Sequence, residues 1–375
     1  MLNRLKMALL AAMASVIAIS YAEARELRAT SHVSPQTDSM KAGYGAFVEQ
    51  LAARTGGAYT VKVFGGGALF GADTALQGIS DGVADLGYVS PHHGPAQFPR
   101  VGVLFNDLGF VGRHPAPVAA AANELLMLEC PGCLKEFAGQ GVVCTGLSTA
   151  PGMSIMTREP VHELKDIAGM KIRSPGSLWE KYLASMGATP VALSSAEQYE
   201  AISRGVVDGT MHILSSLDNL SLADVTPHVL LVDSGIFRSN CLFAFNRDVW
   251  SGMDEATRRI VLELGLNAGV DVPMAQIAGG ERATENARAK GVEFNQPSPS
   301  IEAHLAEFAG GQTKAAVEAA KGRGVEEAAE IAAAMERLTA KWQAVWAETG
   351  GDVEAFKARM REDIISRIDL TKHGL

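Results

Sequence analysis

The amino-acid sequence predicts an α/β protein built from two similar lobes. A seven-residue unit, Ile-Ser-Asp-Gly-Val-Ala-Asp at 79–85, recurs as Ile-Ser-Arg-Gly-Val-Val-Asp at 202–208. Each copy ends a helical stretch, turns at a glycine and enters a short apolar strand. Helix and strand patterns alternate around both copies, and 375 residues are more than one core needs. A cleft between two such lobes is a natural place for a small ligand.

The first residues predict export. Arg4 and Lys6 precede an apolar run over 7–20, and Ala22-Glu23-Ala24 supplies small residues where a signal peptidase cleaves. A membrane anchor is the alternative, but this run is shorter than the roughly 20 residues that span a bilayer. We therefore expect residues 1–24 to be a signal peptide. The mature chain would begin near Arg25, lie in the periplasm and have no membrane insertion.

The charge balance limits the possible partners. The chain carries 33 Lys and Arg against 42 Asp and Glu, a formal net charge of −9. An acidic surface without basic clusters argues against nucleic acid or an anionic membrane as partner. Any site for an anion must then be made locally, by one or two well-placed cations.

The elements of the first lobe follow in chain order from residue 27. Apolar residues over 40–51 recur at three- and four-residue spacing, which predicts a helix. Strands are expected over 27–33, 59–64 and 85–89. The alternating pattern continues through Val101–Phe105, a helix over 117–129 and a strand over 141–147. This order predicts a mostly parallel sheet with crossover helices, and we assign residues 25–149 plus 238–278 to the first lobe.

The second lobe is expected over residues 150–237 plus 279–375, together with long C-terminal helices. Its strands are predicted over 171–176, 190–193 and 229–233, and an apolar strand over 241–246 follows. Helical patterns fill 254–292 and 300–370, interrupted at glycines 322–324 and 350–351. We expect the lobes to be hinged by strands that cross between them near 147–150 and 237–243.

Four cysteines bear on redox chemistry. Cys130-Pro131-Gly132-Cys133 has the spacing of a redox motif, but it follows an Ala- and Leu-rich helix and is expected in a turn. We favour a local structural disulfide over a reactive dithiol. Cys144 and Cys241 lie in apolar strand-like runs, where they fit buried thiols, and their pairing stays open.

Two loops invite other ligands. Gly65-Gly66-Gly67 precedes Phe70, but no Gly-Lys-Ser/Thr follows, so we favour a close backbone approach to a ligand over a phosphate site. His92 and His93 are adjacent, and neighbours on an extended chain point opposite ways with no further ligand at metal spacing. Hydrogen bonding of one histidine to a ligand and a merely exposed loop both stay open.

Several ordered segments resemble a known family. These are Leu164–Gly176, which contains Lys171-Ile172-Arg173, and the run from Gly187 to Gly209, which contains Val206-Val207-Asp208-Gly209. The His32-Val33-Ser34-Pro35 opening and Asp85-Leu86-Gly87 match too. Together they are similar to the periplasmic solute-binding proteins of tripartite ATP-independent periplasmic (TRAP) transporters, the DctP-like family.

The resemblance implies a two-lobed periplasmic binding protein of the Venus-flytrap type, with hinge strands crossing between the lobes. It implies binding of a small organic acid and delivery to a membrane permease, without catalysis and without a cofactor or metal. In this family the arginine of Lys-Ile-Arg holds the ligand carboxylate through two hydrogen bonds, and here that residue is Arg173. A planar guanidinium matches a carboxylate well, and Arg173 lies at the carboxyl end of a predicted strand.

The chain also departs from the family pattern. His212 stands where many members have a ligand-contacting Asn, and a histidine there can donate a hydrogen bond to a second polar group. Sialic-acid-type members have a second arginine about twenty residues before the first, where this chain has Met153 and Ser154, and an aromatic residue where it has Ser195. We therefore expect a C4-dicarboxylate or a hydroxy or keto acid rather than sialic acid.

The remaining candidate site residues are hydroxyl, imidazole and apolar side chains around the expected cleft: His32, Phe70, Ser90, His92, Met153, Trp179, Ser195 and Phe237. Met153, Trp179 and Phe237 are equally typical of core residues.

Two other classes of function stay open. A periplasmic enzyme would rest on the Cys130–Cys133 thiols or on a metal at His92 and His93, but no partner set for either is apparent. A free-thiol count and a metal assay distinguish both. The same shape would also serve an ABC importer or a sensor, and a neighbouring permease gene would decide between these.

Overall fold

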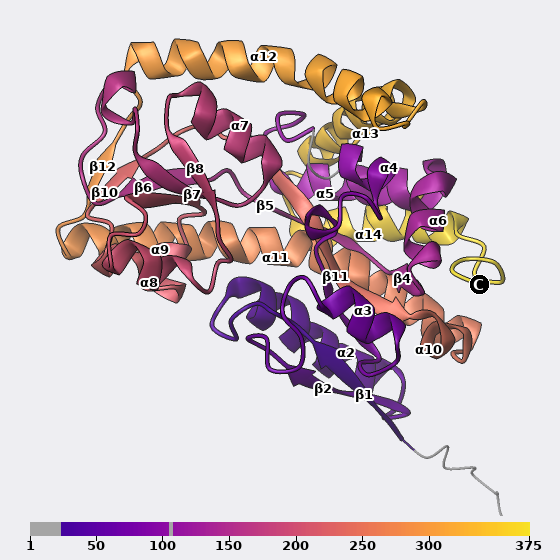
Figure 1. The fold of residues 1–375 in the computed structure, drawn as a ribbon. Coiled ribbons are helices and arrows are strands. Elements are labelled where there is room, and N and C mark those ends of the chain that lie inside the picture. Colours follow the sequence, from indigo (N-terminus) through magenta and orange to yellow (C-terminus); the bar gives the residue numbers. More distant parts are fainter. Residues whose placement is uncertain (1–23, 105–107) are drawn as a thin grey trace, which may run out of the picture.

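The structure, a computed structural model, describes residues 24–104 and 108–375. These residues form two six-stranded sheets, one in each lobe (Figure 1). In the first sheet the order is β2-β1-β3-β11-β4, with β5 also paired to β11; the strands are β1 (Arg25–Thr30), β2 (Tyr59–Phe64), β3 (Leu86–Val89), β4 (Val142–Cys144), β5 (Leu147–Ala150) and β11 (Phe237–Asn246). In the second the order is β12-β10-β6-β9-β7-β8; the strands are β6 (Ser154–Thr157), β7 (Lys171–Ser174), β8 (Thr189–Ala192), β9 (Gly209–His212), β10 (His228–Leu230) and β12 (Glu293–Asn295). The two-lobed α/β prediction is confirmed.

Helices cover both sheets and connect them. The main helices are α2 (Ala46–Arg54), α3 (Ala75–Ser80), α4 (Pro99–Gly102), α5 (Pro115–Glu124), α6 (Pro131–Gly139), α7 (Ser177–Ser185), α8 (Gln198–Ser203), α9 (Ser216–Asn219), α10 (Arg247–Ser251), α11 (Glu255–Ala289), α12 (Pro299–Gly322), α13 (Ala328–Glu348) and α14 (Val353–Asp363). Short helical segments are η1 (Ser39–Gly45), η2 (Pro91–His93), η4 (Leu125–Glu129), η5 (Leu164–Asp166), η6 (Leu222–Asp224) and η7 (Ile365–Arg367).

The two lobes repeat one arrangement of strands. β1 is parallel to both β2 and β3, and β7 is parallel to both β8 and β9. The next strand of each sheet, β11 in the first and β6 in the second, is antiparallel. The carboxyl ends of the parallel strands in each lobe therefore lie at one edge of the sheet.

The sequence repeat is the end of one helix and the start of one strand in each lobe. Gly82 and Gly205 follow α3 and α8 with φ of 72° and 70°, which an L side chain rarely adopts. In both copies the N–H of the next valine bonds the carbonyl five residues earlier, at 3.0 Å and 2.8 Å. This pattern closes a helix with a Schellman motif, so the shared Gly-Val is explained by capping.

The aspartate that ends each copy ties neighbouring parallel strands together. The Asp85 carboxylate accepts the backbone N–H of Arg28 at 2.7 Å, beside β1. The Asp208 carboxylate accepts the backbone N–H of Lys171 at 2.8 Å, at the start of β7. The sequence repeat therefore corresponds to the same local structure in both lobes.

Several segments cross between the lobes. β5 and β11 pair antiparallel from Phe237 opposite Ala150 to Cys241 opposite Leu147, at the expected hinge. Figure 1 shows α11 and α12 running beside both lobes. Residues 109 and 110 make a further contact with the second lobe. The Gly109 carbonyl accepts the N–H of Ile236 at 2.7 Å, and Phe110 packs among second-lobe apolar residues.

The C-terminal helices return to the first lobe. Ile301 and Leu305 at the start of α12 belong to the second lobe's core, whereas Ala316 and Ala320 near its end belong to the first lobe's core. α13 packs on α5 and α14 on α11. The C-terminal helices α13 and α14 therefore cover the first lobe, because their apolar faces are buried against first-lobe helices.

A buried carboxylate anchors these helices. Glu124, at the end of α5, accepts the indole N–H of Trp342 at 2.7 Å and is paired with Lys341 at 2.9 Å. Arg367 lies 3.4 Å from the same carboxylate. Three partners satisfy a carboxylate that would be costly to bury alone.

In the described part of the chain, α11 is long and apolar enough to cross a membrane by length and composition. Of its most apolar window, 61% is buried inside the protein, and it packs on α2, α5, α9 and β5. These contacts are those of a core helix.

One segment of the expected alternation of strands and helices is helical. The described part of Val101–Phe105 is helical, since α4 begins at Pro99, while Phe105 lies outside the described residues. Proline favours the first position of a helix. The Glu136 carboxylate of α6 accepts the N–H groups of Arg100 and Val101 at 2.9 Å and 3.0 Å, which caps this helix from another element. That long-range contact has no local sequence signal.

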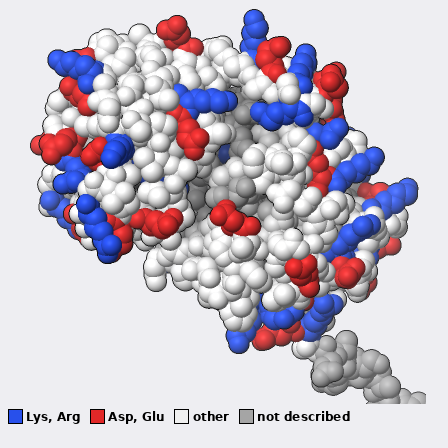
Figure 2. Space-filling view, viewed as in Figure 1, with Lys and Arg blue, Asp and Glu red and all other residues white. Residues whose placement is uncertain are grey.

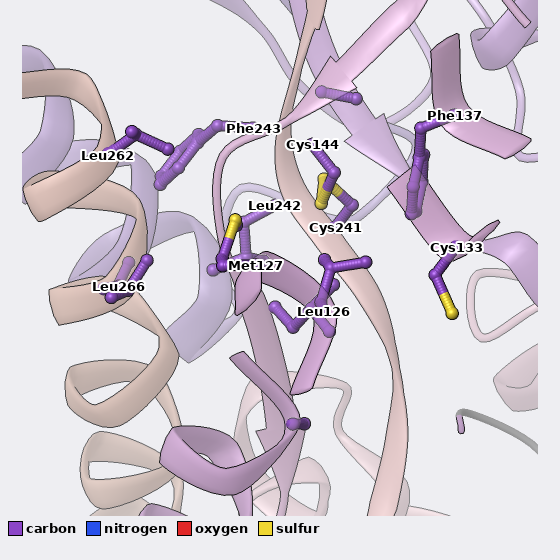
Figure 3. Packing of buried hydrophobic residues seen from close by; sticks show 14 of the residues in the cluster. Leu126, Met127, Cys133, Phe137, Cys144, Cys241, Leu242, Phe243, Leu262 and Leu266 are labelled. Atoms are coloured by element: carbon purple, nitrogen blue, oxygen red, sulfur yellow. A yellow bond between two sulfur atoms is a disulfide. The ribbon is translucent and has the colours of Figure 1, made fainter. Parts of the chain in front are cut away.

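All four cysteines are paired. The local Cys130–Cys133 disulfide is confirmed, although the motif begins α6 rather than lying in an isolated turn, and both residues are buried. Cys144 of β4 and Cys241 of β11 form a second disulfide within the first lobe's sheet, rather than remaining thiols. Figure 3 shows this bond among Leu126, Met127 and Leu242 of the first lobe's core.

Candidate functional site

A cavity of about 760 Å³ lies between the lobes. Its walls are the segments that follow the parallel strands of both sheets, at residues 32–33 and 90–92 in the first lobe and 174–177, 192–195 and 212–213 in the second. Figure 2 shows the molecule hollowed between the two lobes, with acidic and basic side chains interspersed over the visible face. The volume is in the range of sites for small molecules.

Arg173 is the one lysine or arginine among the described residues that line this cavity. It lies on β7 and is only 6% exposed. Its Nε donates to the carbonyl of Leu193 at 2.9 Å and one Nη donates to the carbonyl of Met211 at 3.3 Å. These backbone bonds fix the plane of the guanidinium and leave further N–H donors for a ligand.

The charge of Arg173 has no carboxylate partner within salt-bridge distance among residues 24–104 and 108–375. Burial lowers the pKa of its guanidinium to about 10. A buried, unpaired cation is unfavourable on its own, and an anion entering the cavity removes that cost. The arrangement can therefore hold a carboxylate.

His212 ends β9 beside Arg173. Its Nδ1 accepts the backbone N–H of Ile213 at 3.0 Å, which leaves the proton on Nε2. Burial and then the positive charge of Arg173 lower the pKa of His212 to about 3. The ring is therefore neutral near pH 7 and offers a hydrogen-bond donor, not a second positive charge.

The first lobe supplies a wall of aromatic and polar side chains. The rings of His32 and Tyr88 meet edge to face at 5.0 Å. Ser90 donates from Oγ to the Asn240 side-chain oxygen at 3.1 Å. His92 lies 5.9 Å from the ring of Phe237, centroid to centroid.

Eight of the ten residues expected from the sequence line the cavity: His32, Ser90, His92, Met153, Arg173, Ser195, His212 and Phe237. Phe70 does not, because its ring fills the space over Gly78 on α3, where a Cβ would lie 2.3 Å away. Trp179 is 1% exposed and donates its indole N–H to the Ser234 carbonyl at 3.3 Å, so it supports Phe237 from the core.

The cavity also contains residues that the sequence analysis did not identify: Asp38, Tyr88, Glu180, Asn240 and Gln276. Tyr88 precedes Ser90 by two residues and so shares its face of the strand, a signal that was available. Asn240 follows a register shift in β11 after Arg238, so alternation alone does not place it in the cavity. Gln276 lies in a long helix whose sequence carries no site signal, and only the packing of α11 across both lobes places it here.

Within residues 24–104 and 108–375, no group of three or more His, Cys, Asp or Glu side chains could hold a metal ion. The side chain of His93 lies outside the described residues.

Two α/β lobes joined by crossing strands, with a buried unpaired cation in the cavity between them, define a solute-binding receptor. Residues 30–320 match the model of the bacterial extracellular solute-binding proteins, family 7 (DctP). The chain belongs to this family, the solute-binding proteins of TRAP transporters.

Known relatives agree with this assignment. The C4-dicarboxylate-binding periplasmic protein DctP of Rhodobacter capsulatus is 25% identical over 68% of this chain and 76% of its own. The alignments span only 49% of YiiZ from Salmonella typhimurium and 41% of y4mM from Sinorhizobium fredii, both uncharacterised.

Solved structures show the same fold. A TRAP solute-binding protein from Rhodoferax ferrireducens with copurified benzoate has a TM-score of 0.76 at 20% identity, over 86% of this chain and 99% of that one. A TRAP protein from Sulfitobacter with bound β-D-galacturonate has a TM-score of 0.68 at 22% identity, over 84% of this chain and all of that one.

Proposed function

We propose that the chain is exported to the periplasm, with residues 1–24 removed, and serves there as the receptor of a TRAP transporter. It binds one small organic acid, of the size of a C4-dicarboxylate or a hydroxy or keto acid, and delivers it to the membrane permease. Its function is binding rather than catalysis, and it uses no cofactor or metal.

Arg173 carries this proposal. Its guanidinium is buried in the cavity wall, is oriented by two backbone carbonyls and has no carboxylate partner in the described part of the chain. A ligand carboxylate accepts two parallel hydrogen bonds from such a group. The solutes named for the similar proteins, C4-dicarboxylate, benzoate and galacturonate, differ in shape but all carry a carboxylate.

Closure follows from the placement of the contacts. Arg173 and His212 belong to the second lobe, whereas His32, Ser90 and His92 belong to the first. A ligand that touches both sets stabilises the closed arrangement, because only differential affinity shifts such an equilibrium.

A thermal-shift screen of residues 25–375 against a panel of organic acids tests the proposal, with Arg173→Ala measured alongside. A ligand at 100 times its Kd stabilises by about 2.7 kcal/mol, enough to raise Tm by several degrees. Arg204→Ala is the matched control, because Arg204 is a 75% exposed arginine of the same lobe. We expect one class of acid to shift the wild type and Arg204→Ala but not Arg173→Ala. Equal shifts in all three proteins would remove Arg173 from the site.

A further inference from the structure

The cavity is unequally charged. One cation, Arg173, faces it from the second lobe, whereas four carboxylates of the described residues line it: Asp38, Asp73, Glu180 and Glu197. Glu197 is held by Ser194, whose hydroxyl donates to it at 2.6 Å. His212 adds no positive charge near neutral pH. This balance suits a ligand with one carboxylate better than one with two.

A second polar group lies on the first-lobe side, at Asp38. Asp38 precedes η1 but its side chain makes no capping hydrogen bond to that segment. Instead the carboxylate rests on α11, where both of its oxygens lie 3.3 Å from the position a Cβ of Gly279 would take. Asn219 of the second lobe donates from Nδ2 to Asp38 at 3.4 Å. The glycine on α11 thus allows a carboxylate to approach the helix at the cavity wall.

Gln276 of α11 lines the same cavity as Asp38. It precedes Gly279 by three residues, so the two lie on one face of α11. Gln276 is 8% exposed and lines the cavity, and its buried Oε1 has no hydrogen-bond partner in the described structure. The buried Oδ1 of Asn219 has none either. Buried polar atoms are normally paired, so unpaired ones at a cavity wall indicate a place for a ligand's donors.

We propose that Asp38 and Gln276 form a second subsite that binds hydrogen-bond donors, either hydroxyl or ammonium, on a ligand whose single carboxylate is held by Arg173. This deepens the proposed function and rests on it. The subsite selects against dicarboxylates, because a second carboxylate would meet the charge of Asp38 and would leave the acceptor of Gln276 unpaired. The ligand class is then a monocarboxylate with hydroxyl or amino groups.

Isothermal titration of the mature chain with matched linear acids of four to six carbons tests the subsite. At each length the terminus is methyl, hydroxyl, ammonium or a second carboxylate. We expect the hydroxy or amino acid to bind at least tenfold more tightly than the dicarboxylate of the same length. Dicarboxylates that bind as tightly as the best donor-bearing acid would overturn the proposal.

Three variants test which residue causes the discrimination between donor-bearing acids and dicarboxylates. Asp38→Asn is expected to reduce it at least tenfold, and it weakens the amino acid more than the hydroxy acid if ammonium is the natural group. Gln276→Leu is expected to reduce the advantage of the donor-bearing acids over the methyl-terminated acid. Glu180→Gln removes one negative charge from the same cavity outside the subsite. If it changes the discrimination as much as Asp38→Asn does, total charge rather than this subsite is responsible and the proposal is wrong.

Failure of the subsite and failure of the receptor function have different signatures. A protein that binds acids through Arg173 but shows no preference for donor-bearing ones lacks the subsite and keeps the function. A protein whose acid binding survives Arg173→Ala overturns the subsite, because the carboxylate is then not held by Arg173. A protein that binds no acid of the panel overturns the receptor function as well.

Discussion

Replacing Arg173 by methionine should separate ligand binding from folding. Methionine is unbranched and uncharged, so it keeps the packing of the aliphatic part of arginine at the end of β7. The substitution removes every hydrogen bond that the guanidinium can give a ligand. It also removes a buried cation whose solvation was lost on folding.

The two effects have different magnitudes. Losing one partner of a buried charge pair costs about 3–5 kcal/mol, so Kd for the best acid of the panel should rise roughly 10²- to 10⁴-fold. Burial lowers the pKa of Arg173 from its ordinary value to about 10. At 1.36 kcal/mol per pH unit, that corresponds to a folding penalty of about 3 kcal/mol that methionine does not carry. Against this stand two lost backbone hydrogen bonds, each contributing about 1–2 kcal/mol. We expect the ligand-free unfolding free energy to stay within about 2 kcal/mol of wild type.

Arg258→Met is the matched comparison. Arg258 is 7% exposed and donates to the carbonyls of Trp250, Ser251 and Leu370, but it does not line the cavity. Its loss should lower the unfolding free energy by about 2–4 kcal/mol, since three hydrogen bonds disappear, and leave Kd unchanged. Urea denaturation without ligand and isothermal titration measure both quantities. The reasoning is refuted if Arg173→Met destabilises the ligand-free protein as much as Arg258→Met does while it still binds the acid within tenfold of wild type.

Four further outcomes follow from other contacts. Because the pKa of His212 is about 3, its ring stays neutral between pH 5 and 8. Titration of His212 should therefore not change the affinity for a strong acid in that range. A tenfold gain in affinity on acidification that disappears in His212→Gln would contradict this. The lowered pKa of His212 also means that the unfolded protein binds this proton more readily than the folded protein does. The contribution of His212 to stability should therefore decrease as pH falls from about 6.5 toward 3. Urea denaturation of the wild type and of His212→Gln measures this difference. A disulfide that closes a longer loop stabilises the folded state more. Removing the Cys144–Cys241 disulfide, with a separation of 97 residues, should therefore cost about 4–5 kcal/mol, and removing Cys130–Cys133, with a separation of 3, about 2 kcal/mol. Equal losses of unfolding free energy in urea would contradict this dependence on loop length. Glu124→Ala should lower the unfolding free energy by about 3–5 kcal/mol, because Lys341 and Trp342 lose a buried partner, and acid binding should be unaffected; a weaker Kd would link the C-terminal helices to the site.

The local elements were largely predictable because their signals are local. Strand β2 has the predicted bounds, and the glycines at 322–324 and 350–351 separate α12, α13 and α14 as expected. The repeat predicted two lobes correctly since it encodes a helix cap and a strand-tying aspartate in each. The helix over Val101–Leu104 was missed because Glu136, 35 residues away, caps it.

The site was predictable in part for the same reason. Arg173, His212 and Ser90 lie at or directly after strand ends, and parallel strands bring such positions together. Phe70 was misplaced because the choice between cavity and helix surface depends on the small residue Gly78, which lies opposite its ring.

The sequence by itself determined the class of fold, the presence of two similar lobes and the position of Arg173 near the end of a strand, since periodicity, glycine caps and strand ends depend on neighbouring residues. Only the tertiary structure decided that α13 and α14 cover the first lobe, that Cys144 reaches Cys241, and that Asp38 and Gln276 line the same cavity. These contacts join residues that are far apart along the chain. Their geometry depends on how the helices that cross both lobes pack, which no local pattern specifies.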